Sequence, residues 1–180
     1  PIDLWVGKVD YKLPLSKAFS METGVKATRS AFINDNKVEN WINGSWVIQE
    51  LFSNYSKLNE SIYAIYNSVD WKLSEQTSLK AGLRYEKTQS TLKDRNDSTL
   101  VARDYGLFFP SIFVNHNLSS TSSVSLAFSS RITRPTFNDL APFTIFMDPT
   151  SFVTGNPNLQ PVISNSVKLD YKRNAVLWSV

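Results

Sequence analysis

The side chains that could perform acid–base or metal chemistry are few in this sequence and lie far apart in it. His116 is the single histidine and there is no cysteine, so the chain cannot form a multi-histidine or thiolate metal site by itself. Four carboxylates could in principle supply the acid and base pair of glycoside hydrolysis: Glu22, Asp70, Glu86 and Asp170. They alternate with lysine or arginine along strand-like segments, which favours a solvated polar wall. We therefore expect no catalytic, cofactor-binding or metal-binding residues, and no enzyme.

The composition limits the class of protein further. Charged residues make up 19% and aromatic residues 13% of the chain, and the net charge is +3. The basic residues are scattered and form no stripe of the kind that nucleic-acid binding needs. No apolar run approaches the roughly 20 residues of a membrane helix. Hydropathy, however, does not detect strands that present an apolar side chain to lipid at every second position.

A period of two dominates the pattern of apolar residues. The segment SLKAGLRYE (78–86) is one example, and similar alternation marks residues 8–13, 19–28, 123–131 and 164–172. This alternation predicts strands with one apolar and one polar face. Residues 60–73 and 105–118 alternate less clearly, but their β-branched and aromatic content also predicts strands. We expect about eight strands of about 10–15 residues, with Trp71, Tyr171, Tyr85 and Phe128 near membrane interfaces.

The connections between the predicted strands alternate in length. Short turns are expected at PLSKA (14–18), SEQTS (74–78), SSTS (119–122) and KRNA (172–175). Between them lie longer connectors at about residues 34–59, 93–104 and 133–161. Tight turns on one side and long loops on the other are typical of outer-membrane barrels. The sequence therefore predicts an all-β, antiparallel, up-and-down transmembrane β-barrel with short periplasmic turns and long extracellular loops.

The last long connector carries most of the prolines. Residues 129–161 read SSRITRPTFNDLAPFTIFMDPTSFVTGNPNLQP and contain five of the eight prolines. Because proline cannot donate to a β-ladder, we expect this segment to leave the sheet and to pack its phenylalanine and leucine side chains over the barrel mouth. Arg131 and Arg134 could bind an anionic ligand or brace Asp139 and nearby carbonyl groups, and we favour bracing.

The same segment carries a family resemblance. SSRITRPTFNDLAPF, followed by GNPNLQP and a strand, resembles the signature of TonB-dependent receptors, and within them the outer membrane protein beta-barrel family. The motif-loop residues singled out by this match are Arg131, Arg134, Pro135, Asp139, Leu140, Pro142, Phe143, Gly155, Asn156, Pro157, Leu159 and Pro161, and Ser130 and Ile132 also fit. The chain departs from the usual pattern at Ser129, Ala141 and Val162. We expect the motif loop to be structural or close to the ligand.

The resemblance implies a 22-stranded barrel in the bacterial outer membrane that is filled by a plug domain and energised through TonB. It implies lipid, TonB and a surface lipoprotein as partners, and a siderophore, cobalamin, glycan or peptide as ligand. It implies no cofactor and no nucleic acid. We expect residues 1–180 to be part of such a barrel, without the plug domain and the TonB box.

Two other architectures remain open at this point. The first is a secreted, soluble β-sandwich that binds carbohydrate through WINGSW, where Trp41 and Trp46 would face the ligand. The second is a complete eight-stranded barrel, in which the eighth strand would pair with the first.

Overall fold

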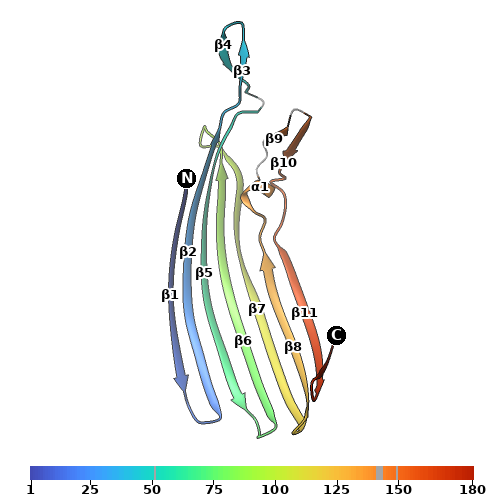
Figure 1. Ribbon diagram of the computed structural model, residues 1–180. Helices are drawn as coiled ribbons and strands as arrows, with labels where there is room; N and C mark the ends of the chain where they lie inside the picture. Colours follow the sequence, from blue (N-terminus) through green and yellow to red (C-terminus); the bar gives the residue numbers. More distant parts are fainter. Residues whose placement is uncertain (51, 141–143, 149) are drawn as a thin grey trace.

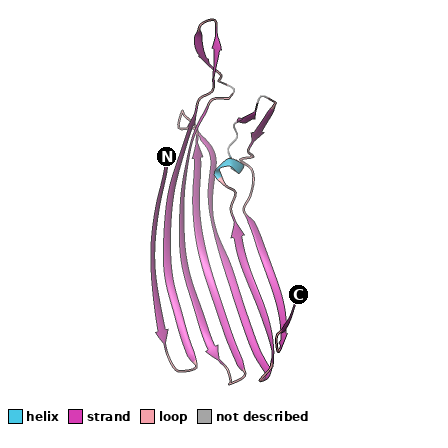
Figure 2. Cartoon of the chain, in the orientation of Figure 1, coloured by secondary structure: helices cyan, strands magenta, loops and turns pink. Residues whose placement is uncertain are grey.

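In the computed structural model, the chain forms one tall, curved, single-layered sheet with two small hairpins and a short helix at one end (Figures 1 and 2). The structure describes residues 1–50, 52–140, 144–148 and 150–180. The strands of the main sheet, in spatial order, are β1 (Ile2–Pro14), β2 (Phe19–Asn36), β5 (Asn54–Lys72), β6 (Thr77–Lys93), β7 (Thr99–Ser119), β8 (Ser122–Thr133), β11 (Val162–Arg173) and β12 (Val176–Ser179). The remaining elements are the hairpin of β3 (Glu39–Ile42) and β4 (Ser45–Ile48), helix α1 (Phe137–Leu140), and the hairpin of β9 (Thr144–Asp148) and β10 (Ser151–Thr154).

The main sheet is antiparallel throughout and each of its strands pairs with its neighbour along the chain, as the sequence predicts. Strands β1 and β12 are the two edges of the sheet, which does not close on itself. The alternative of a complete eight-stranded barrel is therefore wrong. Figure 1 shows that the strands share one direction of curvature, as staves in a barrel wall do.

Several strands are longer than the sequence pattern indicates. Strand β5 has 19 residues and β7 has 21, whereas we expected at most about 15. The predicted connector at residues 93–104 is also too long, because β6 continues to Lys93 and β7 begins at Thr99. The reason is physical: towards the ends of the strands that bear the long connections, one face becomes polar and the other mixes polar residues with apolar ones such as Leu58, Leu92 and Val101. The sequence there loses its period of two while the backbone ladder continues.

The two ends of the sheet differ in their connections. The turns at residues 15–18, 73–76, 120–121 and 174–175 are tight, and residues 37–53 and 134–161 form much longer connections at the opposite end. The Ser16 hydroxyl accepts hydrogen bonds from the backbone N–H groups of Ala18 (3.1 Å) and Phe19 (3.0 Å), which fixes the first tight turn. The predicted contrast between short turns at one end and long connections at the other is confirmed, except that the connection between β6 and β7, residues 94–98, is short.

The connector at residues 37–53 is not a featureless loop. It contains the β3–β4 hairpin, which stands above the end of the sheet (Figure 1). Asn43 (φ 49°) and Gly44 (φ 83°) both adopt left-handed backbone conformations between its strands. An Asn-Gly pair suits this two-residue turn because asparagine and glycine tolerate positive φ better than other residues.

The strand registers separate two faces of the sheet. One row of directly opposed residues runs Val25, Ile65, Tyr85 and Phe108, and it belongs to the face that we call the apolar face. Side chains on this face lie open: Ile65 is 56% exposed, and Leu83 and Leu169 are 50% and 48% exposed. In a soluble sandwich these side chains would fill a dry core, so their exposure contradicts the sandwich alternative.

Aromatic side chains bound the apolar face above and below. Near the tight turns, Phe19 and Trp71 form an edge-to-face pair with ring centroids 5.9 Å apart, and Tyr171 stacks on Trp178 at 5.5 Å. At the other boundary lie Tyr63 and the pair of Tyr85 and Phe108, whose centroids are 4.9 Å apart. We call the part of the apolar face between these two aromatic boundaries the band. On β5 the band runs from Tyr63 to Trp71, which matches the roughly 9–11 residues that a tilted strand needs to cross the hydrocarbon layer.

The predicted interface position of Phe128 is wrong, because Phe128 lies in the middle of β8, opposite Ile112 and Val167. None of the helices formed by the described residues is both long and apolar enough to cross a membrane.

The assignment of the apolar face predicts how strongly a charged side chain placed there destabilises the protein. Replacing Phe128, which lies in the middle of β8 on the apolar face, by arginine is expected to lower the free energy of unfolding in lipid vesicles by about 2–4 kcal/mol. Ser125 on the same strand points to the opposite face and provides a matched control, since Ser125→Arg is expected to change the free energy by less than about 1 kcal/mol. Urea titration of both variants in vesicles measures the difference, and equal costs would contradict the assignment of the faces.

Candidate functional site

The face opposite the apolar face, which we call the polar face, carries the candidate site. Its lower and middle parts bear the charged residues of the strands. Asp70 and Lys80 form an exposed ion pair (3.5 Å), and exposed Lys168 pairs with the partly buried Asp170 (3.0 Å). The predicted solvated wall is confirmed for these groups. The upper part of the polar face is instead covered by α1 and nearby described residues of the segment 134–161, which we call the motif loop.

The part of the motif loop around α1 folds back over the polar face, whereas the β9–β10 hairpin stands above α1 and its strand β10 is exposed (Figure 1). The Phe137 ring of α1 lies 4.3 Å from the ring of Phe32 on β2, measured between centroids, although β2 and β8 are separated by three strands in the sheet. An apolar cluster lies under the loop and consists of the buried residues Leu92, Val101 and Leu140, with Leu58 and Phe137 packed against them. The predicted packing of the loop phenylalanine and leucine side chains is thus confirmed for Phe137 and Leu140. It is wrong for Phe152 and Leu159, which are 66% and 41% exposed.

The loop enters the polar face where the sheet parts. Pairing between β7 and β8 extends upward only to Ser111 and Ser129, next to Pro110. Proline has no N–H group to donate to a ladder, so Pro110 is a natural end point for the β7–β8 pairing. Strand β8 then ends at Thr133 while β7 continues upward, and α1 lies beside this parting (Figure 1).

Asp139 of the motif caps helix α1. Its carboxylate accepts hydrogen bonds from the backbone N–H and the hydroxyl of Thr136, both at 2.7 Å, and the Thr136 hydroxyl accepts the Asp139 N–H at 3.4 Å. This reciprocal arrangement is a capping box. The hydrogen bonds from Thr136 lower the pKa of Asp139. The Asp139 carbonyl also accepts the N–H of Asn156 (2.7 Å), which ties the two halves of the motif together.

Arg134 is a brace, but its partner is not Asp139 as expected. Its guanidinium donates to Glu86 Oε2 at 2.6 Å and to Thr88 Oγ1 at 2.9 Å, both on β6. Arg84 Nε lies 3.1 Å from the other oxygen of Glu86, within ion-pair distance. The Glu86 side chain is only 12% exposed, so the prediction of a solvated carboxylate is wrong for Glu86. Glu86 instead forms ion pairs with Arg84 of β6 and Arg134 of the motif loop, and it thereby joins the loop to the sheet.

A second arginine holds the other end of the loop. Arg103 on β7 donates to the carbonyl of Pro157 at 3.0 Å and to the carbonyl of Leu159. Proline at position 157 leaves its carbonyl available while removing its N–H, and Pro161 directly precedes β11. The GNPNLQP half of the motif is therefore anchored through its backbone.

The remaining predicted residues fall into three groups. Pro135 directly precedes Thr136, which caps α1, and Gly155 directly precedes Asn156, whose N–H bonds to the Asp139 carbonyl. Both residues therefore have a structural role in the loop. Pro142 and Phe143 lie outside the described residues. Trp41 and Trp46 face each other across the β3–β4 hairpin with centroids 5.2 Å apart, and they are 59% and 65% exposed.

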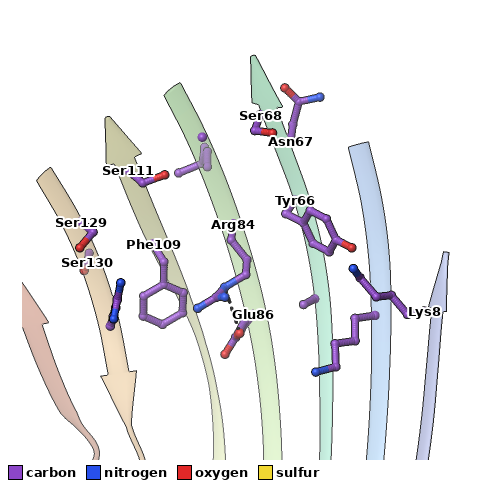
Figure 3. A pocket seen from close by; sticks show the side chains of 15 residues that line it. Lys8, Tyr66, Asn67, Ser68, Arg84, Glu86, Phe109, Ser111, Ser129 and Ser130 are labelled. Atoms are coloured by element: carbon purple, nitrogen blue, oxygen red, sulfur yellow. Dashed lines mark ion pairs between the residues drawn. The ribbon is translucent and has the colours of Figure 1, made fainter. Parts of the chain in front are cut away.

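Below the motif loop, the polar face contains a hollow of about 480 Å³ (Figure 3). Four cationic side chains and one carboxylate line it: Lys8, Lys26, Arg84, Arg131 and Glu86. The Arg84 guanidinium lies 5.2 Å from the centroid of the Phe109 ring, which is nearly fully buried in the wall. The hollow thus combines an aromatic floor with an excess of positive charge.

Small residues give the hollow its depth. Gly82 has no side chain, and a Cβ atom there would lie 2.9 Å from the Ser111 hydroxyl. Gly24 leaves room for the Tyr66 ring, whose hydroxyl donates to Asp10 and which lines the hollow. No three histidine, cysteine, aspartate or glutamate side chains gather as a metal site in the part of the chain that the structure describes.

Sequence reasoning missed Glu86, Thr88 and Arg103 as partners of the motif loop. Their alternation places them on the polar face, and this signal was visible. Their partners depend on the register of β6 and β7 and on the path of the loop, neither of which the one-dimensional pattern contains.

Glu60 on β5 provides a pH-dependent prediction. It lies above Tyr63, outside the band, and partial burial raises its pKa above the ordinary value of 4.5 although Arg134 and Arg103 oppose this shift. The folded protein thus binds this proton more tightly than the unfolded chain does. Stability therefore falls as the pH rises from about 4.5 through the raised pKa. We expect Glu60→Gln to slow hydrogen exchange in the motif loop at pH 8, and this gain should shrink at pH 4. A gain that is equal at both values would contradict the assignment.

Comparison with known proteins agrees with this architecture. The model of the outer membrane protein beta-barrel family matches residues 1–180. Among solved structures, the chain is similar to one described as "Copper transporter OprC", with a TM-score of 0.72 and 14% sequence identity. That alignment covers 97% of this chain and 28% of the transporter chain, so the present chain spans about a quarter of that protein. No curated protein matches the sequence. The apolar face bounded by aromatic residues is accordingly the lipid-facing side of a wall in the bacterial outer membrane, and the chain belongs to the outer membrane protein beta-barrel family.

Proposed function

We propose that the chain forms part of the 22-stranded barrel of a TonB-dependent receptor, which takes up a ligand across the outer membrane. In this proposal the polar face lines the lumen, a plug domain fills the barrel, and TonB supplies the energy for transport. Lipid surrounds the apolar face, and a surface lipoprotein assists at the outer rim.

The observation that carries the proposal is the motif loop on the polar face. An open pore conducts best with a clear lumen, whereas Arg134 and Arg103 hold this loop across the inner wall through named contacts. A loop fixed there narrows the mouth, which suits a receptor that captures one ligand class. The family match and the likeness in fold to an outer-membrane transporter support the same reading. The ligand classes that remain are siderophore, cobalamin, glycan and peptide.

Uptake in cells with and without TonB tests this function. The full-length receptor, purified from outer membranes in detergent, is expected to retain a ligand from the growth medium that mass spectrometry can identify. Accumulation of that ligand by intact cells should stop when TonB is deleted or the proton gradient is collapsed. Uptake that continues unchanged under both conditions would indicate a passive channel and contradict the proposal.

A further inference from the structure

We propose that the β6–β8 end of the hollow is a binding subsite for an oxyanion, a carboxylate or phosphate group carried by the transported ligand. This inference rests on the proposed function insofar as it assigns a role in ligand capture to the hollow. It is drawn from four side chains, Arg84, Arg131, Ser111 and Ser129, all of which line the hollow.

The strand registers bring these groups together in two adjacent rows. Gly82, Ser111 and Ser129 are directly opposed on β6, β7 and β8. Arg84 is opposed to Phe109, and Arg131 follows Ser129 by two residues on the same face. Arg84 and Arg131 therefore lie on either side of Phe109. Their backbones are at least roughly 10 Å apart, since paired strands are about 4.8 Å apart and the β7–β8 pairing has already ended at Ser111 and Ser129. Two arginine side chains can converge on one anion across this separation.

Most hydrogen-bond donors at the β6–β8 end of the hollow have no acceptor within the described part of the chain. Arg131 is exposed, and no acidic side chain or hydrogen-bond acceptor among the described residues contacts its guanidinium. The hydroxyls of Ser111 and Ser129 likewise have no hydrogen-bond partner there. Arg84 reaches Glu86 through Nε, which leaves its terminal nitrogens pointing into the hollow region near Phe109 (Figure 3). Guanidinium forks match the geometry of carboxylate and phosphate oxygens.

The charge balance favours an anion. Glu86 is shared by Arg84 and Arg134, so these three groups together retain one positive charge. Arg131 adds a second, and Lys26 at the far end of the hollow adds a third without an ion-pair partner among the described residues. The Lys8 charge is offset by Asp10 at 2.7 Å. A neutral ligand would leave this excess positive charge without a partner in the hollow, whereas an oxyanion would neutralise part of it.

The absence of a side chain at Gly82 creates the space for the ligand group. A Cβ at this position would already lie 2.9 Å from the Ser111 hydroxyl, so a branched residue would occupy the volume beside both serines. The Phe109 ring therefore forms the base of the site, and Gly82 leaves space beside it for the ligand group. Arg84 and Arg131 provide hydrogen-bond donors from two sides.

Binding of two probes to the full-length receptor in detergent tests the subsite. Titration calorimetry at low ionic strength would measure the Kd for inorganic tripolyphosphate and for citrate, which separate phosphate from carboxylate recognition. We expect Arg131→Gln to weaken binding of the preferred probe at least tenfold, because it removes a charged donor at an exposed position that the fold does not need. Gly82→Val is expected to weaken binding to a similar extent by filling the gap.

Lys12→Gln is the matched control, since Lys12 is an exposed lysine on the same face outside the hollow. We expect it to change the Kd less than twofold. The subsite is overturned if the receptor and its Arg131→Gln variant bind both probes equally, or if Lys12→Gln weakens binding as much as Arg131→Gln. Because calorimetry uses no TonB and no proton gradient, intact probe binding without TonB-dependent uptake would refute transport alone. Uptake without probe binding would refute the subsite alone.

Discussion

Glu86→Gln is expected to release the motif loop at a cost of about 3 kcal/mol, near the lower end of the range for breaking a buried ion pair. Glu86 is 12% exposed and balances Arg134 from the loop and Arg84 from the wall. Without its charge, the two guanidinium groups remain close together and repel each other. Arg134 would then leave the polar face, and the loop would lose its contact with β6.

Hydrogen exchange followed by mass spectrometry can measure this release for each segment. We expect faster exchange in α1 and at residues 150–161, with little change in β1 and β2 near the tight turns. Glu22→Gln, which removes a wall carboxylate that has no ion-pair partner among the described residues, is the control and should leave the loop unchanged. Equal exchange in Glu86→Gln and the unmodified protein would show that the brace contributes nothing.

Leu140→Ala is expected to destabilise the docked loop by about 2–5 kcal/mol. Leu140 is 3% exposed and packs with Leu92 and Val101, so truncation removes apolar contact and leaves a cavity at the centre of the cluster. The wall strands keep their ladders in this variant, and the loss should therefore appear as local opening of the loop.

Leu159→Ala is the matched control for Leu140→Ala. Leu159 belongs to the same loop but is 41% exposed, and its contact with Arg103 uses the backbone carbonyl, which the substitution preserves. We expect its effect to stay below about 1 kcal/mol. Exchange rates measured in parallel would compare the two variants, and a larger effect from Leu159→Ala would contradict the position of the apolar cluster.

The membrane-spanning part of the fold was predictable from the sequence, because lipid on one face and water on the other impose a period of two. Segments such as 78–86 show this period clearly, and each became a strand in the expected order. The contrast ends above Tyr63 and Tyr85, where one face becomes polar and the other carries both polar residues and the apolar cluster under the motif loop. The true lengths of β5 and β7 were therefore not visible in the pattern.

The candidate site was predictable only in part. The motif identified Arg134, Asp139 and Leu140 as important, and each makes a specific contact in the loop. Their partners were not predictable, because Glu86 and Arg103 are indistinguishable in sequence from other charged residues of the wall. A long loop that folds back on its own sheet depends on contacts over many residues, and these have no local signature.

In the receptor proposed above, the uneven height of the wall would affect how a ligand reaches the lumen. Strands β5, β6 and β7 stand tall, while β8 and β11 have 12 residues each and end lower. A molecule that approaches from outside therefore meets the tall strands β5–β7 on one side and the lower ends of β8 and β11 on the other. The motif loop begins and ends at these lower strand ends. We expect substitutions in the motif loop to change the association rate of a large ligand before they change its equilibrium affinity.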